Sequence, residues 1–144
     1  MGHAYRMSRQ FLPTESYMPC NPPPWGALTA IDASTGKRKW EVPLGVLPWL
    51  ADRPEAAKWG SLNLGGPIIT GGGLVFIGAT LDSYLRAFDV ESGAELWKGK
   101  LPTSARATPM TYSSHGKQYV VIAAGGHDVP GVPMGDYLVA FALE

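Results

Sequence analysis

An eleven-residue motif occurs twice in this 144-residue chain and constrains its fold more than any other feature. The copies are AIDASTGKRKW at residues 30–40 and AFDVESGAELW at residues 87–97. Alanine, aspartate, glycine and tryptophan stand at the same places in both. Four residue types matching in register are typical of a structural repeat in which each copy makes the same contacts. We therefore interpret the motif as architectural and expect no catalytic role for Trp40 or Trp97.

Each position of the motif has a physical role in a strand–turn–strand unit. Asp32 and Asp89 begin the turn, where a carboxylate accepts hydrogen bonds from backbone amides two or three residues later. Gly36 and Gly93 end the turn, where a hairpin with a one-residue bulge needs a positive φ. The tryptophan follows on the return strand. Because an indole needs a small-residue surface to stack on and an acceptor for its N–H, we expect each tryptophan to join one sheet to its neighbour.

Short strands separated by glycine-bearing turns are predicted along most of the chain. Their spacing of about 8–12 residues is typical of antiparallel sandwiches, barrels or propellers. RPEAAKW, residues 53–59, is predicted to form one or two helical turns, and the remainder of residues 45–66 to be loop. The predicted strands are residues 27–32, 39–44, 66–70, 74–80, 84–90, 94–101, 107–113, 117–125 and 136–144.

A third, partial copy of the repeat favours one of these architectures, the propeller. YLRAF at residues 84–88 recurs as YLVAF at residues 137–141, but no turn and no tryptophan follow it. The strands therefore group as two, four and three. Propellers close with about four to eight four-stranded blades, so we predict an all-β fold, a partial β-propeller of about two to three blades. Exposed sheet edges would then favour self-association of the isolated chain.

These groups define the expected segments of the chain. They are an extended, proline-rich lead-in at 1–25, an incomplete blade at 26–44, an inter-blade insert at 45–66, a full blade at 67–101 and an incomplete blade at 107–144.

Composition excludes several classes of function. Twelve basic and twelve acidic residues cancel, without a basic stretch that would bind nucleic acid. The single cysteine, Cys20, excludes an internal disulfide and a zinc site built from cysteines. No apolar stretch approaches the roughly 20 residues of a membrane helix, and the first residues are too polar for a signal peptide. We find no HExxH, P-loop or GxSxG motif.

The doubled A-x-D-x-x-[TS]-G-x-x-x-W skeleton resembles the tryptophan-docking repeat of eight-bladed quinoprotein dehydrogenases. GGPIITGGGLVFIGATLDSYLRAFD (65–89) and ATPMTYSSHGKQYVVIAAGGH (107–127) resemble the C-terminal end of that superfamily. PCNPPPWG (19–26), NLGG (63–66) and GGHDVPGVPMGDYLVAFAL (125–143) narrow the resemblance to membrane-bound glucose dehydrogenase and its relatives that use pyrroloquinoline quinone (PQQ). The similarity extends from about Pro19 to Glu144.

This resemblance implies a function for a longer parent protein. Such enzymes oxidise aldoses or other polyols at the periplasmic face of the inner membrane. They hold PQQ with a divalent cation, Ca²⁺ or Mg²⁺, near the propeller axis and pass electrons to ubiquinone. The family's catalytic base and cation ligands lie mainly upstream of this segment, so no catalytic or metal-binding residue is assigned here. The isolated segment is expected to be inactive.

His127 is the main candidate for contact with substrate or cofactor. It follows two glycines at the end of a predicted strand, where backbone can approach a ligand and an imidazole can donate or accept a hydrogen bond. The resemblance places this loop at the mouth of the cofactor and substrate site, so Gly126 is included. Asp128 is either a second polar contact or, as we favour, a loop-capping residue. Asn63 either binds quinone or carboxylate oxygens or forms a turn.

The remaining candidates have competing interpretations. Trp49 and Trp59 either cover a planar cofactor or, more commonly for such residues, are buried against a neighbouring blade. Arg106 is either a carboxylate ligand or, as we favour, exposed. His115 is predicted at an exposed hairpin tip. The glycines at 71–73 are predicted in a hairpin, with little to support phosphate binding.

A non-catalytic propeller is the alternative to the enzyme. The quinoprotein-repeat lipoproteins of outer-membrane assembly share the tryptophan motif but use no cofactor. Such a scaffold would need only the motif itself. The insert that carries Asn63 and the loop that carries His127 favour the dehydrogenase.

Overall fold

The computed structural model describes residues 7–8, 18–129 and 131–142 of the chain. Within these residues the regular elements are nine β-strands and two short 3₁₀ helices, so the predicted all-β class is confirmed. Much of the predicted lead-in at 1–25 lies outside the described residues.

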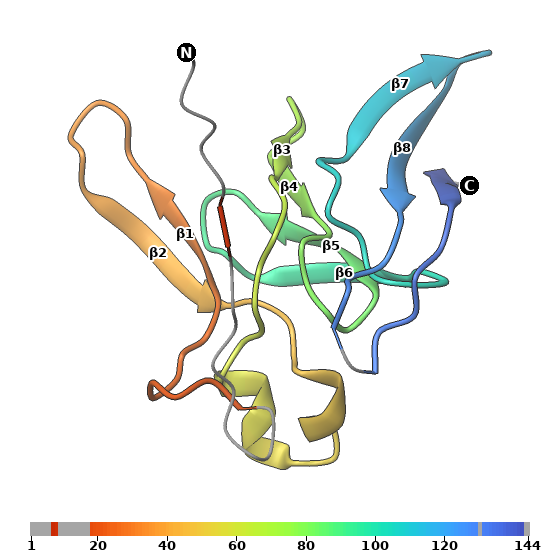
Figure 1. Ribbon diagram of the computed structural model, residues 1–144. Helices are drawn as coiled ribbons and strands as arrows, with labels where there is room; N and C mark the ends of the chain where they lie inside the picture. Colours follow the sequence, from red (N-terminus) through yellow and green to blue (C-terminus); the bar gives the residue numbers. More distant parts are fainter. Residues whose placement is uncertain (1–6, 9–17, 130, 143–144) are drawn as a thin grey trace, which may run out of the picture.

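The strands form three antiparallel sheets in chain order. Figure 1 shows them side by side and splayed like adjacent propeller blades. The first sheet contains β1 (Ala27–Ile31) and β2 (Arg38–Pro43). The second contains β3 (Ile68–Ile69), β4 (Leu74–Ile77), β5 (Tyr84–Asp89) and β6 (Glu95–Lys100). The third contains β7 (Met110–Ser114), β8 (Lys117–Ala124) and β9 (Tyr137–Ala142).

The burial of each strand follows from its place in this arrangement. β1 alternates exposed and half-buried residues, as expected of a strand with one covered face. In β5 every residue from Leu85 to Phe88 is buried, because the middle sheet has a neighbour on both faces.

Apolar layers fill the spaces between neighbouring sheets. One layer joins Leu28 and Val42 of the first sheet to Val75 and Phe88 of the second. Another joins the second and third sheets and includes Leu85, Phe76, Ile122, Val139 and Phe141. Burial of these side chains, at about 25 cal/mol per Å² of apolar surface, is the main favourable contribution to the association of the sheets.

The motif aspartates pin the two matching turns as the sequence predicted. Oδ1 of Asp32 accepts a hydrogen bond from the backbone N–H of Ser34 at 2.8 Å, and Oδ1 of Asp89 accepts one from Ser92 at 2.7 Å. Hydrogen bonds from the hydroxyls and amides of these serines lower the pKa of both carboxyls. The strand register shifts after Ala30 in one copy and after Ala87 in the other, which confirms the bulge.

Trp40 joins the first sheet to the second. Its indole N–H donates to the carbonyl oxygen of Val90 at 2.9 Å. Its ring lies against Gly93, where an added Cβ would be 2.7 Å from a ring carbon. Trp97 makes the equivalent step to the third sheet, because its ring meets Phe141 of β9 edge-on at 5.1 Å. Each tryptophan therefore contacts the neighbouring sheet, as expected.

Several boundaries differ from the sequence prediction. β7 begins at Met110 rather than at 107, since Pro109 cannot donate a strand hydrogen bond. β4 ends at Ile77 rather than at 80, because Ala79 has a φ of 48° and leaves the extended conformation. β3 is reduced to two residues.

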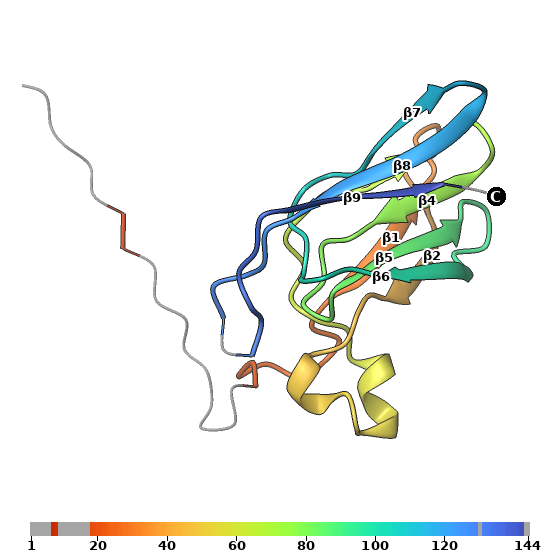
Figure 2. The same cartoon turned by 90° about the vertical axis from the view of Figure 1, so that its right-hand side faces the viewer.

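Two 3₁₀ helices occupy the insert. The turns predicted at 53–59 are observed as η2 (Pro54–Lys58). The segment before them was predicted as loop and instead forms η1 (Pro48–Leu50). Both begin with proline, whose fixed φ suits the first helical position. Figure 2 shows both helices beyond one end of the sheets.

We expect Gly93→Ala to destabilise the chain more than Gly36→Ala. Both glycines have positive φ, 74° and 67°, so both substitutions carry backbone strain of roughly 1–3 kcal/mol. Only at Gly93 does the new methyl group collide with Trp40, whereas nothing lies within 4 Å of a Cβ at Gly36. The additional loss for Gly93→Ala is about 1–3 kcal/mol, measured by urea unfolding. Equal losses for the two variants would contradict the docking of Trp40 on this turn.

Candidate functional site

Three connecting segments meet at one end of the sheets. They are the insert between β2 and β3, the connection between β6 and β7, and the loop between β8 and β9. Figures 1 and 2 show the insert helices and the β8–β9 loop at this same end. Val129 and Val132 of the loop share an apolar cluster with Leu47, Leu50 and Ala56 of the insert. We call this region the loop end.

His127 lies in the interior of the loop end. Only 1% of its surface is exposed. Its Nδ1 is 2.5 Å from the hydroxyl oxygen of Ser104. Its Nε2 is buried and has no hydrogen-bond partner among the described residues. A buried polar atom without a partner is costly, typically about 1–3 kcal/mol, so the ring is suited to binding a polar atom at Nε2.

Electrostatics keep this imidazole neutral. Burial lowers the pKa of His127, and the positive charge of Arg106 lowers it further. A neutral ring carries one N–H and one lone pair, so it can hydrogen-bond an oxygen-rich ligand without adding charge to the site.

The backbone just before His127 is packed tightly against Ser104 and Pro133. Gly126 has a φ of 83°, and its N–H donates to the carbonyl oxygen of Ser104 at 2.8 Å. A Cβ at Gly126 would lie 2.2 Å from the carbonyl oxygen of Pro133, so no other residue fits there. Asp128 is exposed and makes no side-chain hydrogen bond to the described residues. The two interpretations of Asp128, a second polar contact or a loop-capping residue, stay predictions.

Asn63 is the second residue with a buried unpaired atom. Its Oδ1 has no hydrogen-bond partner among the described residues. Its amide lies against Gly26, where a Cβ would be 2.6 Å from Nδ2. Two residues after Asn63, the insert lies against the connection between β6 and β7. A Cβ at Gly65 would be 2.8 Å from the carbonyl oxygen of Arg106 in that connection. Asn63 and His127 thus belong to adjoining segments of the loop end.

The two insert tryptophans differ in their surroundings. Trp59 is half-buried and meets Trp25 edge-on, with ring centroids 5.5 Å apart. The backbone N–H of Trp25 also donates to the backbone carbonyl oxygen of Trp59. Trp49 is 37% exposed. Trp59 is therefore engaged in structural packing, whereas Trp49 is partly exposed.

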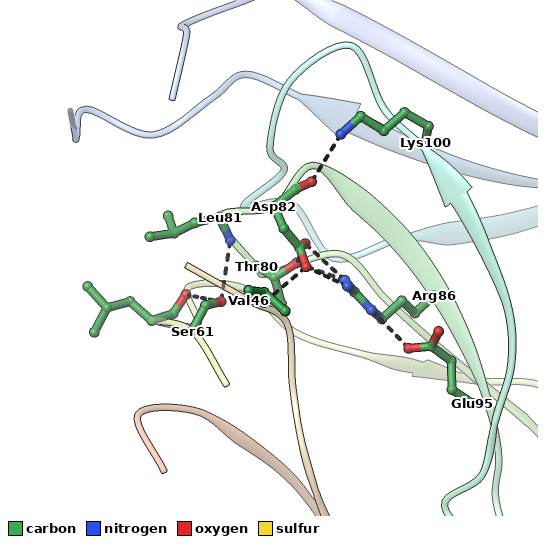
Figure 3. Close-up of polar contacts among 9 residues, drawn as sticks. Val46, Ser61, Thr80, Leu81, Asp82, Arg86, Glu95 and Lys100 are labelled. Carbon is green, nitrogen blue, oxygen red and sulfur yellow. Dashed lines mark hydrogen bonds and ion pairs between the residues drawn. The ribbon is translucent and has the colours of Figure 1, made fainter. Parts of the chain in front are cut away.

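An ion-pair network that sequence analysis missed fastens the insert to the second sheet (Figure 3). Arg86 of β5 is 5% exposed and pairs with both carboxylate oxygens of Asp82, at 2.5 and 3.0 Å. It also pairs with Glu95 at 3.0 Å. Oδ2 of Asp82 accepts a hydrogen bond from the backbone N–H of Val46 at 3.0 Å, which fixes the start of the insert. An arginine within an otherwise apolar strand, YLRAF, was the available sequence signal.

The far end of the insert is fixed as well. The N–H of Ser61 donates to the carbonyl oxygen of Leu44 at 2.9 Å, and the hydroxyl oxygen of Ser61 accepts from the N–H of Leu81 at 3.5 Å (Figure 3). Burial is the largest single effect and opposes the charge of Arg86, but the hydrogen bonds and negative charges of Asp82 and Glu95 together outweigh it and raise the pKa of the guanidinium. The network holds Val46 near the start of the insert, and the hydrogen bonds of Ser61 hold the insert two residues before Asn63.

The other predicted residues lie at the surface or in turns. Arg106 is exposed and forms no ion pair with the described residues. His115 is exposed at the β7–β8 turn, as predicted. The glycines at 71–73 form the β3–β4 turn.

The described residues contain neither a metal-binding cluster nor a membrane-spanning helix. No group of three or more His, Cys, Asp or Glu side chains is arranged to hold a metal ion. None of the described helices is long and apolar enough to cross a membrane.

Comparison with known proteins identifies similar sequences. A family model described as "PQQ: Glucose/ethanol/alcohol dehydrogenase, beta-propeller domain" matches residues 1–120. Quinoprotein glucose dehydrogenase of Escherichia coli K12 is 47% identical over 130 residues, which cover 88% of this chain and 16% of that protein. Quinate/shikimate dehydrogenase (quinone) of Acinetobacter baylyi is 44% identical over 149 residues, which cover 99% of this chain and 18% of that protein.

Comparison with solved structures identifies similar folds. The crystal structure of quinohemoprotein alcohol dehydrogenase from Comamonas testosteroni matches with a TM-score of 0.56 and 30% identity. The match covers 77% of this chain and 14% of that one. The chain thus spans a small part of the length of each of these proteins.

We expect Arg86→Met to cost about 3–5 kcal/mol of unfolding free energy, because it leaves the carboxylate of Asp82 buried without its cation. Arg38→Met is the matched control. It removes the exposed pair with Glu41, whose side chains are 62% and 42% exposed, and should cost under about 1 kcal/mol. Urea unfolding measures both. Similar losses for the two variants would contradict a structural role for the buried network.

The chain should lose stability as the pH falls below about 6.5, the ordinary pKa of histidine. Because the pKa of His127 is lower in the folded chain, the unfolded state takes up a proton first. This contribution is fully present above the unfolded pKa and is lost as the pH falls toward the folded one. His127→Gln should remove this component of the pH dependence between about pH 7 and 5, whereas His115→Gln should retain it. Thermal unfolding at several pH values measures the effect.

Proposed function

Because the chain belongs to the PQQ-dependent glucose/ethanol/alcohol dehydrogenase β-propeller family, we propose that it is the C-terminal part of a sugar dehydrogenase. The parent protein oxidises an aldose such as glucose with PQQ and a divalent cation, and passes electrons to ubiquinone. It acts at the periplasmic face of the inner membrane. The isolated segment is inactive, because other blades must complete the site.

The observation that carries the proposal is the pair of buried, unpaired polar atoms at the loop end. Nε2 of His127 and Oδ1 of Asn63 lack partners among the described residues. PQQ has carboxylates and quinone oxygens that accept hydrogen bonds, and a sugar has hydroxyls that both donate and accept. A histidine N–H and an amide oxygen are suited to such groups. The residues present therefore fit the organic cofactor or its substrate.

The cation is a separate case. The described residues assemble no cluster of carboxylates or imidazoles that could hold it. A divalent cation of this kind needs about six or more oxygen ligands, which must come from elsewhere in the parent protein. We assign this chain no part in binding the cation.

When bound, PQQ supplies the oxidising group that accepts a hydride from the sugar. The contribution of this chain is binding and orientation. His127, neutral and held by Ser104, directs Nε2 toward a ligand oxygen. Gly126 lets the backbone of Pro133 approach the residue that precedes the ring. Burial of His127 excludes water, which strengthens a hydrogen bond made there.

The alternative function is a non-catalytic propeller scaffold. A scaffold has no use for unsatisfied atoms in its interior, since each lowers stability without a ligand to compensate. The orphan atoms of His127 and Asn63 therefore support the enzyme.

His127→Ala in the full-length parent should raise the KM for glucose about tenfold or more, because it removes a hydrogen bond to ligand. PQQ-dependent reduction of a dye acceptor by the reconstituted enzyme measures this. His115→Ala, at an exposed turn, is the matched control and should leave KM unchanged. An unchanged KM in His127→Ala would contradict the site. Activity with quinate but not glucose would retain the dehydrogenase and overturn the choice of substrate.

A further inference from the structure

The contact between Ser104 and His127 determines more than the position of the ring. Ser104 is completely buried, and its hydroxyl has His127 Nδ1 as its one partner among the described residues. Its carbonyl accepts the N–H of Gly126 at 2.8 Å, so the backbones of the two residues are also joined. Thr103 donates to the carbonyl oxygen of Pro133, which fastens the other side of the loop.

Two arrangements of protons are possible for this pair. In the first, the imidazole N–H is at Nδ1 and donates to the serine. The serine proton and the Nε2 lone pair are then both buried without partners. In the second, the serine donates to Nδ1 and the imidazole proton lies on Nε2. Only one buried group, the Nε2–H, then lacks a partner.

The second arrangement is favoured by the count of unsatisfied groups. It avoids one buried, unpaired donor, which costs about 1–3 kcal/mol. It also leaves a donor, rather than an acceptor, at the atom that faces a ligand.

We infer that Ser104 is a positioning residue that fixes His127 in the neutral form protonated at Nε2, so that His127 donates a hydrogen bond to an acceptor oxygen of the ligand. His127 then cannot take a proton at Nε2 from the substrate, and its task is orientation. Only the identity of the ligand rests on the proposed function. The state of the ring is a property of this chain.

The charged side chains near the ring favour the neutral form of His127. Arg106 is the charged side chain whose field reaches the ring, and it disfavours a second proton. Asp128, the next residue, is exposed to solvent and forms no hydrogen bond or ion pair with the ring.

The first test is the position of the proton. Long-range ¹H–¹⁵N NMR spectra of the labelled chain at pH 7.5 should show a protonated Nε2 and an unprotonated Nδ1 for His127. His127→Gln assigns the signal, and His115 serves as the internal reference. A proton on Nδ1 would overturn the inference.

The second test is the direction of a pKa change in Ser104→Ala, which also applies if the isolated chain gives poor spectra. A serine that donates to Nδ1 of the neutral ring must turn and accept once Nδ1 is protonated, which leaves its own buried proton unpaired. It therefore stabilises the neutral ring more than the charged one, and its removal should raise the pKa of His127. A serine that accepts from Nδ1–H also stabilises the charged ring, so its removal should lower the pKa and overturn the inference. NMR titration measures this in the chain. The acid limb of kcat/KM measures it in the full-length enzyme.

The enzyme provides a further comparison. Ser104→Ala should raise the KM for sugar about tenfold with a smaller change in kcat, whereas Ser113→Ala on exposed β7 should change neither. An unchanged KM and an unchanged acid limb in Ser104→Ala would overturn the positioning role. Absence of any PQQ-dependent activity in the wild-type parent would instead contradict the proposed function and leave the NMR result standing.

Discussion

The packing of one indole on one glycine connects the first two sheets of this protein. Trp40 reaches across from β2, stacks on the turn at Gly93 and donates to the carbonyl of Val90. The contact works only because the turn has no side chain at that point. It also places the sheets at the separation at which the apolar side chains between them meet. Trp97 likewise contacts Phe141 of the third sheet. A tryptophan at the same place in each motif copy therefore joins each sheet to the next.

This arrangement concentrates irregular backbone at the loop end. The insert and the loop between β8 and β9 pack together there. The insert would be poorly anchored by its short 3₁₀ helices alone. The ion pair of Arg86 and Asp82 compensates by holding Val46, near the start of the insert, while a backbone hydrogen bond joins Ser61 to Leu44. A charged network used in this way defines position more than it adds stability.

The loop end combines tight packing with two unsatisfied atoms. Every other described buried side-chain nitrogen or oxygen has a partner, yet Nε2 of His127 and Oδ1 of Asn63 do not. Interiors of folded proteins rarely leave such atoms unpaired, because each one lowers stability. Our proposal explains the two unpaired atoms as ligand-binding groups that lie in adjoining segments. Such ligand-binding groups would be consistent with the dehydrogenase family to which this chain belongs.

The sequence by itself determined the repeat, the all-β class, the sheet-to-sheet role of the tryptophans and the placement of His127 in a loop. These follow from short-range chemistry: a carboxylate that caps its own turn, a glycine with positive φ, and alternating apolar residues. Tertiary structure alone decided which partner each group meets. Ser104 carried no local signal of its role, because His127 reaches it only when separate segments pack together. The arginine in YLRAF was a signal, but its partners Asp82 and Glu95 were identified only by the fold. The exposure of Asp128 was likewise decided by the path of its loop through space, which no periodicity in the chain records.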